Sequence, residues 1–280
     1  MTDSLFLQAV AAIDAGDLIT LRQLMDENPV LLHQRLNKSE GGYFKDPYLL
    51  WFVAYNPIRE QGVPGNIVEI LRSLLEYLQK DRPGSYQEQI DYTLALVATG
   101  SQVKEAGHQL VMIDLLIGAG AFVGDCLPLI AHGGIDAAEH LLKHGSPLTL
   151  PVAVGLDRRG DVLDMMSDAS DEDKYIALLV AAFLGNEALL HYFVQQKVDV
   201  NTFPASIVGF HSHATALHQA VSSGSLTCVE LLVKAGAHLS REDRVFNGTP
   251  LQWARHMENE NHGLQKDRYA QIASYLESRT

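Results

Sequence analysis

Histidines are the residues of this chain best suited to chemistry, because an imidazole titrates near neutral pH and binds metal ions. The sequence holds 12 of them. His140 and His144 are four residues apart, which places both on one face of a helix. Because His144 directly precedes Gly145, the pair is better suited to stabilising the end of a helix than to binding a metal. His211 and His213 have no third ligand nearby in the sequence, and two imidazoles alone make a weak metal site.

Carboxylates gather before one apolar run, over residues 175–183. The acids there are Asp168, Asp171, Glu172 and Asp173. Acids at such a position stabilise the start of a helix, and a catalytic acid–base pair is the weaker alternative. The sequence contains no nucleophile elbow, phosphate-binding loop, dinucleotide-binding glycine pattern or zinc-protease motif. We therefore predict a protein that is not an enzyme and that needs no metal and no cofactor.

Composition and charge exclude several classes of protein. Of the 280 residues, 47% are hydrophobic and 20% are charged, which is typical of a globular protein. The net charge of −13 makes nucleic acid and anionic membranes poor partners. The two cysteines, Cys126 and Cys228, lie far apart in the sequence, so we expect free thiols and no disulfide framework.

Two features predict a cytoplasmic protein. The N-terminal region contains acids but no basic residue before Arg22, unlike a secretory signal peptide. The most apolar stretch, residues 110–131, is interrupted by Asp114 and Asp125 and is too short to span a membrane.

An internal repeat organises the chain. A glycine, a small polar residue and a helical apolar pattern occur at Gly185 and again at Gly224. Weaker copies begin at Gly16, Gly65, Gly107, Gly134 and Gly160. Each glycine can end one helix in a left-handed conformation, and the following residue can cap the next helix. With a mean spacing of about 35 residues, the pattern predicts an all-α solenoid of about eight helix-turn-helix units. The spacing is irregular, so some connecting fingers should be short and others extended.

One segment resembles a known repeat family. The run from Thr215 to Gly224, followed by residues 229–237, resembles a nearly complete ankyrin repeat of the Thr-Pro-Leu-His-x-Ala type. The run from Asn247 to Ala254 is a second match, with Gln252 in place of the histidine. The resemblance is closest over residues 176–257, and the whole of residues 1–280 is interpreted as a single ankyrin-like solenoid that ends in a capping region at 258–280. The chain also resembles bacterial ankyrin-repeat proteins, a group without assigned chemistry, in the stretches 12–17 and 47–54.

The resemblance assigns roles to several of the repeat residues. Thr215 and Thr249 can cap the inner helices, and the small alanines allow neighbouring helices to approach closely. His218 invites interpretation as a general base or a metal ligand. At this ankyrin position, however, the resemblance implies a histidine that joins repeat turns by hydrogen bonds.

Two segments depart from a minimal solenoid. In the first, Asp46 can cap a helix that has Pro47 at its first position, and this helix is apolar on every face. Trp51 and Tyr55 share one face of it and either pack in the core or face a ligand. The second segment is a finger at residues 200–213, rich in apolar side chains that either form a contact surface or fold back on the next finger.

The expected function is binding of a protein partner through the concave groove and the fingers, without catalysis. Tyrosine, tryptophan and arginine dominate interface energetics, so we choose aromatic and arginine side chains near the fingers as anchors. The predicted partner-binding residues are Tyr43, Phe44, Trp51, Tyr55, Arg59, Phe203, Phe210, Phe246 and Trp253. The alternative is a small-molecule or peptide pocket beside Trp51, Tyr55 and Arg59, including an unrecognised hydrolase.

Overall fold

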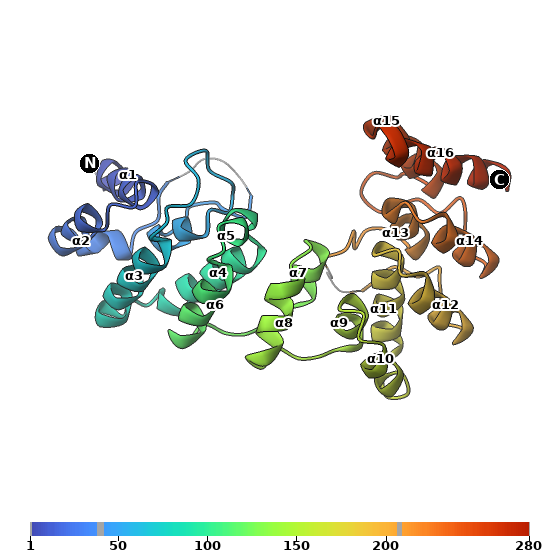
Figure 1. Ribbon diagram of the computed structural model, residues 1–280, viewed down its shortest axis with the longest axis horizontal. Helices are drawn as coiled ribbons and strands as arrows, with labels where there is room; N and C mark the ends of the chain where they lie inside the picture. Colours follow the sequence, from blue (N-terminus) through green and yellow to red (C-terminus); the bar gives the residue numbers. More distant parts are fainter. Residues whose placement is uncertain (1, 38–41, 206–208, 280) are drawn as a thin grey trace. The chain divides into compact units, whose positions relative to one another are not determined.

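The computed structural model describes residues 2–37, 42–205 and 209–279, and these residues form two compact units (Figure 1). Unit 1 comprises Met1–Gly124 and Asp136–Ser146, and unit 2 comprises Asp125–Ile135 and Pro147–Thr280. Regular structure in the described residues is helical, with one isolated bridge between Arg35 and Tyr48, which confirms the predicted all-α class. A single continuous stack over residues 1–280 remains a prediction. No helix among the described residues has both the length and the apolar character needed to cross a bilayer.

Unit 1 is built from helices of very different length. They are α1 (Thr2–Asp14), α2 (Leu18–Glu27), η1 (Pro29–Leu32), η2 (Leu49–Ala54), α3 (Ile67–Asp81), α4 (Tyr86–Thr99), α5 (Ser101–Glu105), α6 (Gln109–Gly118) and α8 (Ile135–Lys143), where η marks a 3-10 helix. The short η2 packs against α1, α3 and α4. It therefore lies in the middle of this unit's core.

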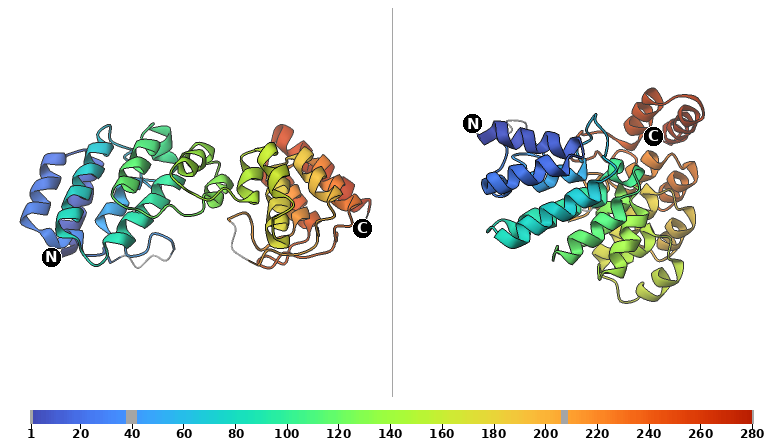
Figure 2. Two further views of the ribbon diagram at one scale, coloured as in Figure 1. Left: turned by 90° about the horizontal axis from the view of Figure 1, so that it is seen from below. Right: turned by 60° about the vertical axis from the view of Figure 1, so that its left-hand side comes forward.

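Unit 2 holds the more regular repeats. Its helices are α7 (Leu127–Ala131), α9 (Leu150–Gly155), α10 (Arg159–Met165), α11 (Asp171–Phe183), α12 (Glu187–Gln195), α13 (Ala216–Ser223), α14 (Leu226–Lys234), α15 (Pro250–Glu260) and α16 (Gly263–Glu277). The inner helices α9, α11, α13 and α15 each contact the next, and the outer helices α12, α14 and α16 do the same (Figure 2). Each repeat thus buries the apolar face of its neighbour.

The turns within the repeats follow the predicted glycine rule only in part. Left-handed backbone, which glycine adopts without strain, occurs at Gly16, Gly107, Gly185 and Gly224. At three other turns the predicted glycine is wrong. Gly65 has no left-handed backbone, and at the other two turns the left-handed residues are Gly133 rather than Gly134 and Asp157 rather than Gly160. Gly160 instead lies inside α10.

The segment after Asp46 does not form the predicted helix. Asp46 itself has a left-handed φ of 45°, and the helix that follows is the 3-10 helix η2 rather than one starting at Pro47. The Pro47 carbonyl accepts a hydrogen bond from the Leu36 N–H, which ties this segment to the end of the first repeat. The chain therefore enters η2 as an extended strand-like segment.

The chain end and the cysteines agree with the sequence predictions. The outer helix α16 buries Tyr269, Ile272 and Leu276 along one face, as the apolar spacing predicts. Cys126 and Cys228 are both buried, and neither forms a disulfide within the described residues.

Candidate functional site

The strongest candidate site lies in unit 2, where the loop before α15 is organised around Asp243. This carboxylate is only 2% exposed. It accepts hydrogen bonds from the backbone N–H groups of Val245 (2.9 Å), Phe246 (2.7 Å) and Gly248 (2.9 Å). It also accepts one from the Trp253 indole N–H at 3.0 Å. The Asp243 side chain therefore holds the backbone of residues 245–248 in place and, through Trp253, attaches this loop to α15.

The hydrogen bonds favour the ionised form of the Asp243 carboxyl group. Burial alone raises the pKa of its carboxyl group, because it removes the charged form from water. The N–H donors outweigh this effect and lower the pKa to about 2. Asp243 is therefore a stable anion that holds the loop.

His218 forms the hydrogen bonds that the ankyrin resemblance implies. Its Nδ1 accepts from the Thr215 N–H at 3.3 Å, and its Nε2 pairs with the Gly248 carbonyl of the next finger at 2.9 Å. Burial lowers the pKa of His218. The structural interpretation of this histidine is confirmed, because both ring nitrogens join repeat turns.

His211 and His213 pack against aromatic rings. The ring centroids of His211 and Trp253 are 5.4 Å apart, and those of His213 and Phe246 are 5.5 Å apart. Burial lowers the pKa of His211, and the neighbouring His213 lowers it further. Both rings therefore extend the aromatic cluster of the loop.

These groups border a groove of about 690 Å³, which we call the Phe246 groove. Its lining residues are His211, Ser222, Phe246, Asn247, Gly248, Gln252, Trp253, His256 and Met257. Phe246 is 72% exposed, although phenylalanine is usually buried. Unit 2 also has two larger hollows, but charged and polar side chains supply most of their lining. The Phe246 groove differs from them in its mainly apolar lining, which includes the rings of Phe246 and Trp253.

The other two predicted anchors of unit 2 are Phe210, which lies in the core, and Phe203, which is covered by two arginine side chains. Phe210 is fully buried against Phe183, with ring centroids 5.0 Å apart. Its prediction as an exposed anchor is wrong. Phe203 is half-buried beneath the guanidinium groups of Arg241 and Arg244, at 5.1 and 4.2 Å from its ring centroid. Phe203 follows the interpretation in which this finger folds back on the next one, whereas Phe210 packs on α11. Ile207 and Val208 lie outside the described residues.

In unit 1, Trp51 and Tyr55 are core residues. Both lie at or beside η2 and are almost fully buried. The Trp51 ring packs against Tyr48 and Tyr92, at centroid distances of 5.4 and 4.3 Å. Phe44 is half-buried on the same cluster, 6.3 Å from Trp51. The prediction that Trp51 and Tyr55 are surface anchors is wrong, and the core alternative holds.

Arg59 is engaged inside the same unit. Its Nη1 lies 2.7 Å from Asp14 Oδ1, which also accepts the Tyr55 hydroxyl at 3.0 Å. The guanidinium carbon lies 3.9 Å from the centre of the Tyr55 ring. Burial lowers the pKa of Arg59, and the Asp14 carboxylate opposes this. Because Arg59 pairs with Asp14 and stacks on the Tyr55 ring, and Trp51 and Tyr55 are buried, these side chains do not border an open pocket among the described residues.

Tyr43 is the predicted anchor of unit 1 that stands most clearly in solvent, with 58% of its surface exposed. Its hydroxyl donates to Asn56 Oδ1 at 2.8 Å. It therefore remains available to a partner.

The acids before residue 175 act as predicted. Asp171, Glu172 and Asp173 form the first turn of α11, and the Ser170 side chain caps it by accepting from the Asp173 N–H at 3.0 Å. The Glu172 carboxylate accepts the Ala205 N–H at 2.9 Å. The helix-start interpretation is confirmed.

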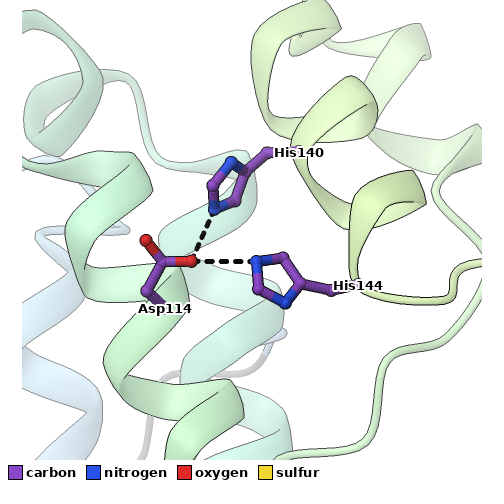
Figure 3. A group of neighbouring side chains, drawn as sticks. All are labelled: Asp114, His140 and His144. Atoms are coloured by element: carbon purple, nitrogen blue, oxygen red, sulfur yellow. Dashed lines mark hydrogen bonds and ion pairs between the residues drawn. The ribbon is translucent and has the colours of Figure 1, made fainter.

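Two acids that matter were missed from the sequence. Asp243 was not singled out, although an Asp a few residues before Asn-Gly is a recognisable turn signal. In the sequence Asp114 only interrupts an apolar stretch, and no local pattern links it to His140. In the structure its Oδ1 lies 2.6 Å from His140 Nε2 and 3.0 Å from His144 Nε2, and Figure 3 shows both rings directed at this one oxygen.

One family model matches most of this chain, and two known proteins are similar to it. A family model described as ankyrin repeats (3 copies) matches residues 65–243. Over 124 residues the chain is 27% identical to the nuclear factor NF-kappa-B p105 subunit of Gallus gallus, an alignment that covers 44% of this chain and 10% of that protein. A human ASB11 ankyrin repeat domain is similar at 16% identity and a TM-score of 0.38, over 82% of this chain and 97% of the domain.

Proposed function

The chain belongs to the ankyrin-repeat family, and we propose that it is a non-catalytic module that binds a protein partner through the Phe246 groove. Ankyrin repeats generally mediate interactions between proteins, and the family is typically non-enzymatic. The groove lies where a finger meets the inner helix α15, on the edge that repeat proteins use for recognition.

One observation carries the proposal: Phe246 is held exposed by the Asp243 loop beside Trp253. A free loop would lose conformational entropy on binding, whereas this loop is already ordered by four hydrogen bonds to one carboxylate. Covering the Phe246 ring removes apolar surface from water, a gain of about 1.5–3 kcal/mol for a side chain of this size. The site therefore resembles a preformed hot spot.

The dimensions of the groove favour a short segment of a partner. Its volume of about 690 Å³ admits apolar side chains of a peptide segment. Around the aromatic floor, Asn247 and Gln252 supply amide groups that can bind the partner's backbone. We propose a partner that inserts an apolar side chain and pairs its backbone with these amides.

The test compares two exposed phenylalanines. Phe246→Ala removes the groove residue, whereas Phe122→Ala removes an equally exposed ring, 74% accessible, in unit 1. Proteins captured by the wild-type chain are identified, and their affinities for both variants are measured by calorimetry. We expect Phe246→Ala to weaken binding by about 30-fold, or about 2 kcal/mol, and Phe122→Ala to leave it unchanged.

Two results would contradict the proposal. One is full partner binding by a folded Phe246→Ala variant. The other is an equal loss in both variants, which would mean that exposed aromatic surface, rather than the groove, is being recognised.

A further inference from the structure

We infer that Asp114, His140 and His144 form a binding site for a divalent transition metal ion, with Zn²⁺ as the expected occupant. The three residues come from two helices of unit 1, with Asp114 on α6, His140 on α8 and His144 just after it. Their ligand atoms all lie within 4.8 Å of one another. This site is separate from the Phe246 groove and does not depend on the proposed function.

The geometry suits a small coordination shell. In a tetrahedral site with ligand bonds of about 2.0–2.1 Å, neighbouring ligand atoms are about 3.3 Å apart. The two Nε2 atoms lie 2.6 and 3.0 Å from Asp114 Oδ1, so an ion enters if these side chains separate by a few tenths of an ångström. All three side chains are partly exposed and have room for this movement. Figure 3 shows the two rings and the carboxylate converging on one point.

The donor set selects the class of metal. Two imidazole nitrogens and one carboxylate oxygen suit Zn²⁺ and its transition-metal neighbours, whereas Mg²⁺ and Ca²⁺ prefer oxygen alone. Three protein ligands leave a fourth position for water, because Asp114 is half-exposed. The site is therefore open and exchangeable, unlike a closed structural zinc site.

The helical spacing supports the pairing of the histidines. Residues four apart on a helix project from the same face, and the ring centroids of His140 and His144 are 4.9 Å apart. In the metal-free protein His140 Nε2 hydrogen-bonds to Asp114 Oδ1, and His144 Nε2 lies at ion-pair distance from the same oxygen. To bind a metal ion through Nε2, each neutral imidazole carries its single proton on Nδ1, and any second ring proton is released to solvent.

A bound ion would attach one segment more firmly to unit 1. Residues 136–146 belong to unit 1, although the residues before and after them belong to unit 2. The segment is held by the buried face of α8 and by the Ser146 hydroxyl, which donates to the Gly124 carbonyl at 2.8 Å. A metal bridge from α6 to α8 replaces the direct contacts of Asp114 with His140 and His144 by bonds to the ion. Because the ion binds the folded state, it should raise the unfolding temperature.

The experiment uses the full chain, freed of metal by chelation and titrated with Zn²⁺ in a calorimeter. Asp114→Asn, His140→Ala and His144→Ala each remove one ligand, and His191→Ala removes an exposed histidine of α12 as the matched control. We expect one equivalent of Zn²⁺ to bind the wild type and the control. Each ligand variant should bind at least about tenfold more weakly and lose the Zn²⁺-dependent rise in unfolding temperature.

A second measurement on the wild type keeps the test independent of variant folding. The X-ray absorption spectrum of the Zn²⁺-loaded protein should show two imidazole ligands with oxygen atoms completing the shell. The inference is overturned if the wild type binds no Zn²⁺, or if the spectrum shows no imidazole. It is also overturned if the ligand variants bind normally while a His211→Ala/His213→Ala double variant does not.

Discussion

Two pairs of aromatic residues that were predicted to bind a partner lie in opposite environments in this protein. Trp51 and Tyr55 in unit 1 and Phe246 and Trp253 in unit 2 were all predicted as anchors on the same grounds. The first pair is buried in the core, whereas the second borders an open groove. Aromatic composition alone therefore does not indicate a binding surface.

The difference lies in what surrounds each segment. The 3-10 helix η2 is enclosed by α1, α3 and α4, so its side chains face protein on every side. The loop 243–248 is instead closed by the Asp243 carboxylate, which satisfies its backbone and leaves the Phe246 ring outside. Local tethering by one acid allows an aromatic side chain to stay exposed in a fixed position.

The largest expected effect concerns the buried cluster. Trp51→Ala should lower the free energy of unfolding by about 3–5 kcal/mol, because it leaves a cavity among Tyr48, Tyr92 and Phe44. Chemical denaturation of the wild type and the variant measures this loss.

Trp51→Phe is the matched control. It keeps a ring in place and removes an indole N–H that has no hydrogen-bond partner in the described part of the chain, so its cost should be smaller. An alanine variant as stable as the wild type would place Trp51 outside the core and undo the contrast between the two clusters.

The second expected effect tests the hydrogen bonds by which the Asp243 carboxylate holds the loop 243–248 in unit 2. The pKa of Asp243 is about 2 in the folded protein, against about 3.9 for an unperturbed aspartate, so ionised Asp243 contributes about 2–3 kcal/mol at pH 7. Because the folded pKa is the lower one, this contribution is complete above about pH 5 and is lost as the pH falls toward 2. Asp243→Asn should therefore be less stable than wild type at pH 7, with a difference that shrinks on acidification.

Denaturation of both proteins at several pH values measures this difference. Asp164→Asn, a change at an exposed acid of α10, serves as the control and should follow the wild-type curve. A stability gap between wild type and Asp243→Asn that stays constant from pH 7 to pH 3 would show that the carboxylate charge does not hold the loop.

The contrast also shows what a sequence can predict. The glycine turns at Gly185 and Gly224 and the bonding of His218 were predicted correctly, because each depends on residues within one repeat or its neighbour. The burial of Trp51 depends on Tyr92, which is 41 positions further along the sequence and on another helix. The meeting of Asp114 with His140 likewise joins residues 26 positions apart. Because the sequence resembles the ankyrin consensus closely only over residues 176–257, no local pattern in unit 1 fixes such contacts.

The smallest expected effect probes the one strongly exposed anchor that unit 1 retains. Tyr43→Ala removes a side chain that makes one exposed hydrogen bond, to Asn56, so stability should change by less than about 0.5 kcal/mol. Its effect on partner affinity should stay below about threefold, because energetic hot spots need a surrounding pocket that excludes water. Calorimetry with the partner used for Phe246→Ala gives the comparison directly. If Tyr43→Ala weakens binding as much as Phe246→Ala does, both units contact the partner. An exposed aromatic residue would then be enough for strong partner binding even outside a groove held in place by hydrogen bonds. The proposed difference between the aromatic residues of unit 1 and those of the Phe246 groove would be wrong.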